Sequence, residues 1–229
     1  MIDASHPRLC RLAAIPLLLA LAGGCSTLSP PSPPPSFYAL DSAPNETRVA
    51  TRAAAPWSRA GPTLIVNPPH AASGFDSQRI IYLRSAHKLE YYAHSEWVDT
   101  PARMLAPLII AALENGGRIR AVIPTPSAAA GDLRLDTEIM RLQHDFGTQP
   151  SRVRFTLRAY VVDNTTRRIV AWREFDESVA AATEEAFGGV VAANRAVHVV
   201  LEQLAGFCDE AAEAWRLAAV ETQQLAPQP

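Results

Sequence analysis

The chain has 229 residues, of which 48% are hydrophobic and 19% are charged, and its formal net charge is −2. This composition is typical of a globular protein with one domain, and it excludes a disordered or fibrous chain. The nearly balanced charge, without any run of Lys or Arg, also excludes the basic stripe that nucleic-acid binding requires. We therefore expect no nucleic-acid partner.

The N-terminal segment, residues 1–24, has the pattern of a secretory signal peptide. Arg8 and Arg11 precede an apolar stretch over residues 12–21, which Pro16 interrupts. This stretch is too short for a transmembrane helix, which needs about 20 residues, but it has the length of a signal-peptide core. Small residues then lead to Cys25.

The sequence Leu-Ala-Gly-Gly-Cys at residues 21–25 resembles a lipobox, in which a lipid-modified cysteine follows small residues. Ala22 stands where the usual pattern has Leu, and this is a mild departure. We predict cleavage between Gly24 and Cys25 and a covalent lipid on Cys25, whose acyl chains anchor the protein in a membrane. The alternative is an ordinary signal peptide, cut near Ala22 or Gly24, with Cys25 left as an incidental thiol.

The segment after Cys25 is rich in Pro and Ser, and its five prolines exclude a helix or a paired strand. Residues 25–36 are therefore predicted to be a tether between the lipid and the domain, either an extended polyproline II segment or a disordered one. The globular domain is predicted over residues 37–220, and residues 221–229 are predicted to be a disordered tail.

The domain is expected to be of the mixed α/β class. Short strands are predicted at residues 37–40, 63–66 and 119–123, and a hairpin is predicted from 80–83 and 89–92. Alternating residues predict longer strands over 132–142, 153–161 and 169–175, with a bulge near residue 140. Apolar residues at helical spacing predict helices from Pro101 to about 115 and over 189–219. The sum is a single domain with a mixed, largely antiparallel sheet covered by two main helices.

The sequence contains no catalytic motif. It lacks a Gly-x-Ser-x-Gly elbow, a phosphate-binding loop and a His-Glu-x-x-His pattern. His87 and His94 would lie on opposite faces of a strand, and His144 and His198 belong to separate elements. Cys208 falls on an apolar helix face, which favours a buried, inert thiol. We therefore expect no catalytic residue, no metal site and no cofactor apart from the lipid on Cys25.

One cluster of aromatic residues stands out around the predicted hairpin, namely Tyr82, Tyr91, Tyr92 and Trp97. Core packing with a tyrosine at the rim explains such a cluster. A recognition surface for another protein also explains it, because Tyr and Trp are favoured anchors at interfaces.

These features together resemble the ABC-type transport auxiliary lipoprotein family, the PqiC-like proteins. The resemblance covers nearly the whole chain after Cys25. It rests on Phe-Tyr-Ala-Leu at 37–40, Ile-Ile-Tyr at 80–82, Leu-Glu-Tyr-Tyr at 89–92 and Trp97 leading to Pro101. The order of the later strands, the turn at Asp163 and the Ala-rich final helix continue the pattern.

The resemblance implies a non-catalytic outer-membrane lipoprotein that faces the periplasm. Its implied partners are an MCE-domain protein and an inner-membrane permease of a system that moves lipids or other hydrophobic molecules, with docking of the MCE protein as its role. Self-association is a further expectation. Two alternatives remain open: a lipid-carrying module, which would need a deep apolar cavity, and a component of another envelope assembly machine.

Overall fold

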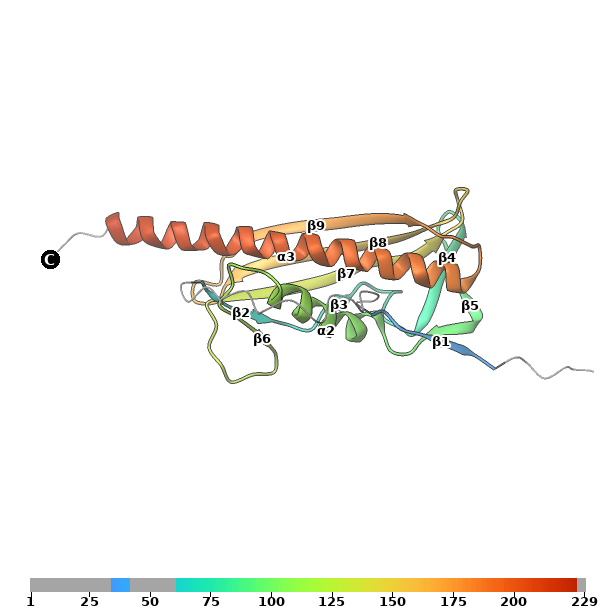
Figure 1. The fold of residues 1–229 in the computed structure, drawn as a ribbon, viewed down its shortest axis with the longest axis horizontal. Helices are drawn as coiled ribbons and strands as arrows, with labels where there is room; N and C mark the ends of the chain where they lie inside the picture. Colours follow the sequence, from blue (N-terminus) through green and yellow to red (C-terminus); the bar gives the residue numbers. More distant parts are fainter. Residues whose placement is uncertain (1–33, 42–60, 226–229) are drawn as a thin grey trace, which may run out of the picture. The chain divides into compact units, whose positions relative to one another are not determined.

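The computed structural model describes residues 34–41 and 61–225, and the described residues from Pro35 onward belong to one compact unit. The predicted signal peptide, Cys25 and most of the predicted tether therefore lie outside the described residues. Within the described ranges the chain forms nine strands, which join one sheet, and two helices (Figure 1). The expected α/β class is confirmed.

Strand β7 (Leu133–Asp145) organises the sheet. On one side it pairs with β8 (Arg152–Asp163), which in turn pairs with β9 (Ile169–Ala180), and both pairings are antiparallel. Its other side pairs successively, in parallel, with β2 (Thr63–Val66), β3 (His70–Ala71) and β4 (Arg79–Ser85).

The remaining strands extend this second side of the sheet. The predicted hairpin is formed by β4 and β5 (Lys88–Trp97), which are antiparallel, and β1 (Ser36–Tyr38) pairs in parallel with β5. Strand β6 (Ala121–Pro124) pairs in parallel with β2. Because the three longest ladders are antiparallel, the predicted mixed, largely antiparallel sheet is confirmed.

A bulge in β7 changes which residues face the core, as the sequence predicts. The pairing with β8 shifts between Ile139 and Arg141. Before the shift the odd-numbered residues from Leu133 to Ile139 are buried, and after it Leu142 and His144 are buried. The bulge therefore places a histidine in the interior, at the end of the strand.

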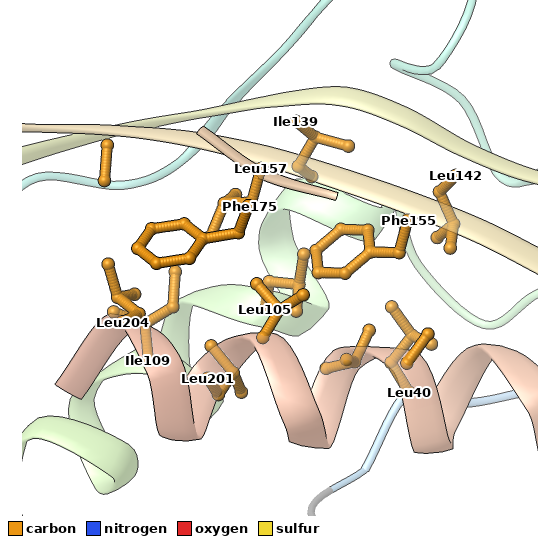
Figure 2. Close-up of a cluster of buried hydrophobic side chains, with 14 of the residues drawn as sticks. Leu40, Leu105, Ile109, Ile139, Leu142, Phe155, Leu157, Phe175, Leu201 and Leu204 are labelled. Atoms are coloured by element: carbon orange, nitrogen blue, oxygen red, sulfur yellow. The ribbon is translucent and has the colours of Figure 1, made fainter. Parts of the chain in front are cut away.

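The two helices, α2 (Pro101–Glu114) and α3 (Ala186–Leu225), provide the other half of the core. Their apolar side chains, Leu105 and Ile109 from α2 and Leu201 and Leu204 from α3, meet Phe155 and other strand residues (Figure 2). Helix α2 begins at Pro101, where the sequence predicts its start, and continues through Pro107.

Helix α3 is longer than the pattern at 189–219 predicts. It has 40 residues, which corresponds to a length of about 60 Å. It begins at Ala186, so that Gly188 and Gly189 lie in its first turn, and it includes residues 221–225 of the predicted tail. Along the sheet it packs against β7, β8 and β9.

Candidate functional site

The aromatic residues singled out from the sequence lie on β4 and β5, but they differ in exposure. Trp97 is 3% exposed and belongs to the core, whereas Tyr91 is 55% exposed. The guanidinium carbon of Arg79 lies 3.9 Å from the centre of the Tyr91 ring, a cation–π contact at the surface. Tyr91 is thus the member of the set that a partner could reach most easily.

Tyr82 and Tyr92 lie between these extremes and contact each other. Their ring centres are 4.8 Å apart, and the Tyr82 ring also meets Phe146 edge-on at 5.8 Å. The guanidinium of Arg84 lies over the Tyr82 ring at 5.1 Å. Packing of this kind holds the hairpin against the end of β7.

The hydroxyl of Tyr92 belongs to a buried hydrogen-bond network. It lies 2.9 Å from Nδ1 of His144, and Nε2 of His144 lies 2.8 Å from the hydroxyl oxygen of Ser151. The backbone N–H of Ser151 donates to the carboxylate of Glu184 at 3.2 Å. This hydrogen-bond network therefore links β5, the end of β7, the start of β8 and the loop before α3.

Burial determines the protonation states of His144 and Tyr92 in this network. It lowers the pKa of His144 from 6.5, against the opposing effect of the Glu184 and Asp145 charges. It also raises the pKa of Tyr92 to about 12, with a smaller contribution in the same direction from Tyr82. At neutral pH the imidazole and the phenol are consequently both neutral, which suits hydrogen bonds in a core.

A serine beside a histidine is the arrangement of an activated nucleophile, but here the pair is enclosed. Ser151 is 0% exposed and His144 is 2% exposed, so a substrate has no access to the hydroxyl. The hydrogen-bond network instead satisfies buried polar groups and joins separate elements. The sequence predicts only that His144 and His198 belong to separate elements; the position of His144 two residues after Leu142, in the buried register, is the signal that marks it as buried.

The remaining sulfur and acidic groups form no further centre in the described part of the chain. Cys208 is 2% exposed, which confirms the buried thiol expected from the sequence, and burial raises its pKa to about 12. Among the described residues, no three side chains of His, Cys, Asp or Glu are grouped to hold a metal ion.

Two hollows of different character were found. Between α3 and the sheet, a cavity of about 10 Å³ is lined by Ile80, His144 and Gly189, among others. On the opposite face of the sheet, an open hollow of about 530 Å³ is lined by Arg158, Tyr160, Ile169, Trp172 and Glu174. Neither is a deep apolar pocket.

A comparison with protein families shows which family the protein belongs to. The family described as the ABC-type transport auxiliary lipoprotein component matches residues 38–205, and the chain belongs to this family. The resemblance noted from the sequence is thereby confirmed. By its description, the family comprises lipoproteins that are auxiliary components of ABC-type transport systems.

Solved structures show the same fold. Protein XCC0632 from Xanthomonas campestris, described as a DUF330 protein, is 23% identical, with a TM-score of 0.65 over 78% of this chain and 97% of that one. A second crystal structure, of an uncharacterized protein, is 10% identical, with a TM-score of 0.58 over 77% of this chain and 99% of that one. A comparison with curated proteins gave no match. Within the described residues, neither helix has the length and apolar character to cross a membrane.

Proposed function

We propose that the protein is a lipid-anchored docking component of an envelope transport system. In this proposal, Cys25 carries the lipid and anchors the domain at the periplasmic face of the outer membrane. The domain then binds an MCE-domain protein that reaches it from the inner-membrane permease. The cargo, lipid or another hydrophobic molecule, passes along the partner and does not enter this domain.

The observation that carries the docking role is the small size of the cavity between α3 and the sheet in the described part of the chain. Sites for small molecules usually have volumes of about 300–1,000 Å³ and apolar walls. The cavity between α3 and the sheet has only about 10 Å³, and the larger hollow is open to solvent and is lined partly by Arg158 and Glu174. A lipid-carrying module would need an enclosed apolar space, so the geometry favours docking over carrying.

The anchor is tested by replacing the cysteine. In cells fed a labelled fatty acid, the wild-type protein should incorporate label and sediment with outer membranes, whereas Cys25→Ala should do neither. Cys208→Ala is the matched control, because Cys208 is buried within the domain and should leave labelling unchanged. Labelling of Cys25→Ala equal to that of the wild type would contradict the anchor.

The docking role is tested by copurification. The tagged, full-length protein should recover an MCE-domain protein from solubilised envelopes of cells that express both. Recovery of none after mild crosslinking would exclude the docking role, whatever the outcome for Cys25.

The surface around Tyr91 is the proposed contact for this partner. Leu89, 48% exposed, lies on the same strand as Tyr91, and exposed tyrosines are common anchors of interfaces. Tyr91→Ala should therefore reduce the recovered MCE-domain protein by about tenfold or more, which corresponds to about 1.4 kcal/mol. Leu217→Ala, an exposed position on α3, should leave recovery unchanged.

A further inference from the structure

Among the described strands, β9 forms a long edge of the sheet that no other strand covers. It has 12 residues and pairs only with β8, and Figure 1 shows it along the outer border of the sheet, with α3 against its inner face. The other described strands with a single neighbour, β1, β3 and β6, have only three, two and four residues. An edge of this length offers a row of backbone donors and acceptors to another strand.

The first part of this edge exposes large apolar side chains. Ile169 is 58% exposed and Trp172 is 61% exposed. Trp172 stacks on Tyr160 with a ring separation of 6.4 Å and an interplanar angle of 26°, which holds it at the surface. Both residues line the open hollow described above, beside the Arg158–Glu174 ion pair at 2.7 Å. Grouped apolar exposure beside an unpaired edge is typical of an interaction surface.

The edge is basic at its start and acidic in its second half, while Arg173 and Glu174 between them are held in ion pairs with Glu210 and Arg158. Arg167 and Arg168 are exposed immediately before β9, and Asp176 and Glu177 lie in its second half. Among the described residues, no ion pair includes Arg167, Arg168 or Glu177. An antiparallel copy of the same edge, centred on Trp172, would bring each basic end beside the acidic half of the other copy.

The charge pattern also disfavours a register centred further along the strand. An antiparallel pairing centred near Asp176 would oppose the acidic halves, because carboxylates of both copies would meet around the axis. When the two-fold axis passes through Trp172, the contact between a basic end and an acidic half occurs on both sides of the axis. The same axis brings the two exposed indoles together. The occupant whose charges and apolar residues fit this edge is therefore a second copy of the chain.

We propose that two copies of the protein associate through β9, antiparallel, about a two-fold axis at Trp172, so that one continuous sheet crosses the interface. The proposal develops the self-association expected of the protein. It depends neither on the lipid at Cys25 nor on the MCE-domain partner, so its failure would leave the docking role standing.

Disulfide trapping tests the position of the axis in the full-length protein within envelopes. Trp172→Cys places two thiols next to each other across the axis, and mild oxidation should yield a covalent dimer. Thr165→Cys is the control: it lies in the turn before β9, beyond Ile169, whose two copies are already six residues or about 20 Å apart in this register, so no dimer should form. Cys208 is buried and does not compete, and the wild-type protein, oxidised in parallel, is the blank for any dimer that forms through Cys25. Equal trapping of both variants, or none of Trp172→Cys, would overturn the proposal.

Charge reversal tests the register. In detergent, the variant with Arg167→Glu and Arg168→Glu should dimerise at least about tenfold more weakly than the wild type, because like charges then face each other. Adding Glu177→Arg should recover most of the lost affinity. Asp176 is left unchanged because its carboxylate accepts hydrogen bonds from Thr156 and Arg154. If the triple variant regains none of the lost dimerisation affinity while every variant keeps its thermal midpoint, the proposal is also overturned. If the double variant fails to fold, the trapping experiment decides.

Discussion

The imidazole of His144 lies against the backbone of Gly189 in the first turn of α3. A Cβ atom at position 189 would come within 2.6 Å of Nδ1 of His144, closer than real Cβ contacts allow. The absence of a side chain at Gly189 is therefore what lets the helix approach the buried chain of Tyr92, His144 and Ser151. One glycine thus sets the distance between α3 and the end of β7.

Alanine substitutions at two glycines of α3 should consequently have opposite effects. Gly189→Ala should lower the free energy of unfolding by about 1–3 kcal/mol, because His144 is hydrogen-bonded on both nitrogens and cannot move freely. Gly206→Ala meets no atom within 4 Å and should raise the free energy of unfolding by about 0.5–1 kcal/mol, since alanine is the better helix former. Urea unfolding measures both; equal effects would contradict the close approach.

The pH dependence of stability should carry a contribution from His144. Burial lowers its pKa from 6.5, so the unfolded chain binds this proton at a higher pH than the folded one. The stability from the neutral imidazole is complete above the ordinary pKa and is lost as the pH falls from there through the lowered pKa of the folded state.

His144→Gln removes this titration, and its free energy of unfolding should therefore decline less than that of the wild type between pH 7 and 5. His198→Gln, at a side chain that is 50% exposed, is the control for the loss of a histidine outside the core. A His144→Gln curve parallel to that of the wild type would show that the imidazole is not buried neutral.

Local patterns were sufficient to predict the elements that have one wet face. In β8, Val153, Phe155 and Leu157 alternate with polar residues, and all three are buried as predicted. The bulge in β7 was predicted because the alternation changes phase there, although Met140, expected to turn inward with Leu142, is only partly buried. A sheet face against water and a helix face against a core both leave periodic signals in the sequence.

Features that depend on distant pairing left no such signal. Strand β3 has two residues, too few for a period, and is defined only by its pairing with β7. The chain from Tyr92 to Ser151 joins residues far apart in sequence, so no local pattern could show it. Strand β9 continues to Ala180, beyond the predicted end at residue 175, because its polar second half is an edge strand paired with β8.

Two leucines on α3 provide a test of the core. Leu204 is 0% exposed, whereas Leu217 is 51% exposed on the same helix. Leu204→Ala should lower the free energy of unfolding by about 2–5 kcal/mol, because it removes buried methyl groups and leaves a cavity. Leu217→Ala should change it by less than about 0.5 kcal/mol. Chemical denaturation of the two variants checks this, and a large loss for Leu217→Ala would place that residue in a contact outside the single chain.

The carboxylate of Asp163 joins the β8–β9 turn to the C-terminal half of α3. It accepts hydrogen bonds from the backbone N–H groups of Thr165 and Thr166 at 2.9 and 2.7 Å, and from Nε1 of Trp215 at 2.7 Å. These bonds, the one from the Thr166 backbone foremost, hold the pKa of Asp163 below its ordinary value of 3.8. The stability they provide is thus present above pH 3.8 and is lost as the pH falls through the lowered pKa.

Asp163→Ala should therefore lower the free energy of unfolding at pH 7 by about 1–3 kcal/mol, because three donors lose their acceptor. The loss relative to the wild type should shrink as the pH falls below 3.8, because the unfolded chain then binds a proton that the native carboxylate, with its lowered pKa, still excludes. Trp215→Phe removes the indole donor alone and should cost about 0.5–1.5 kcal/mol. Asp76→Ala, at an exposed position in the loop before β4, serves as the control. If Asp163→Ala cost no more than Asp76→Ala at pH 7, the turn and α3 would be held together by apolar packing alone.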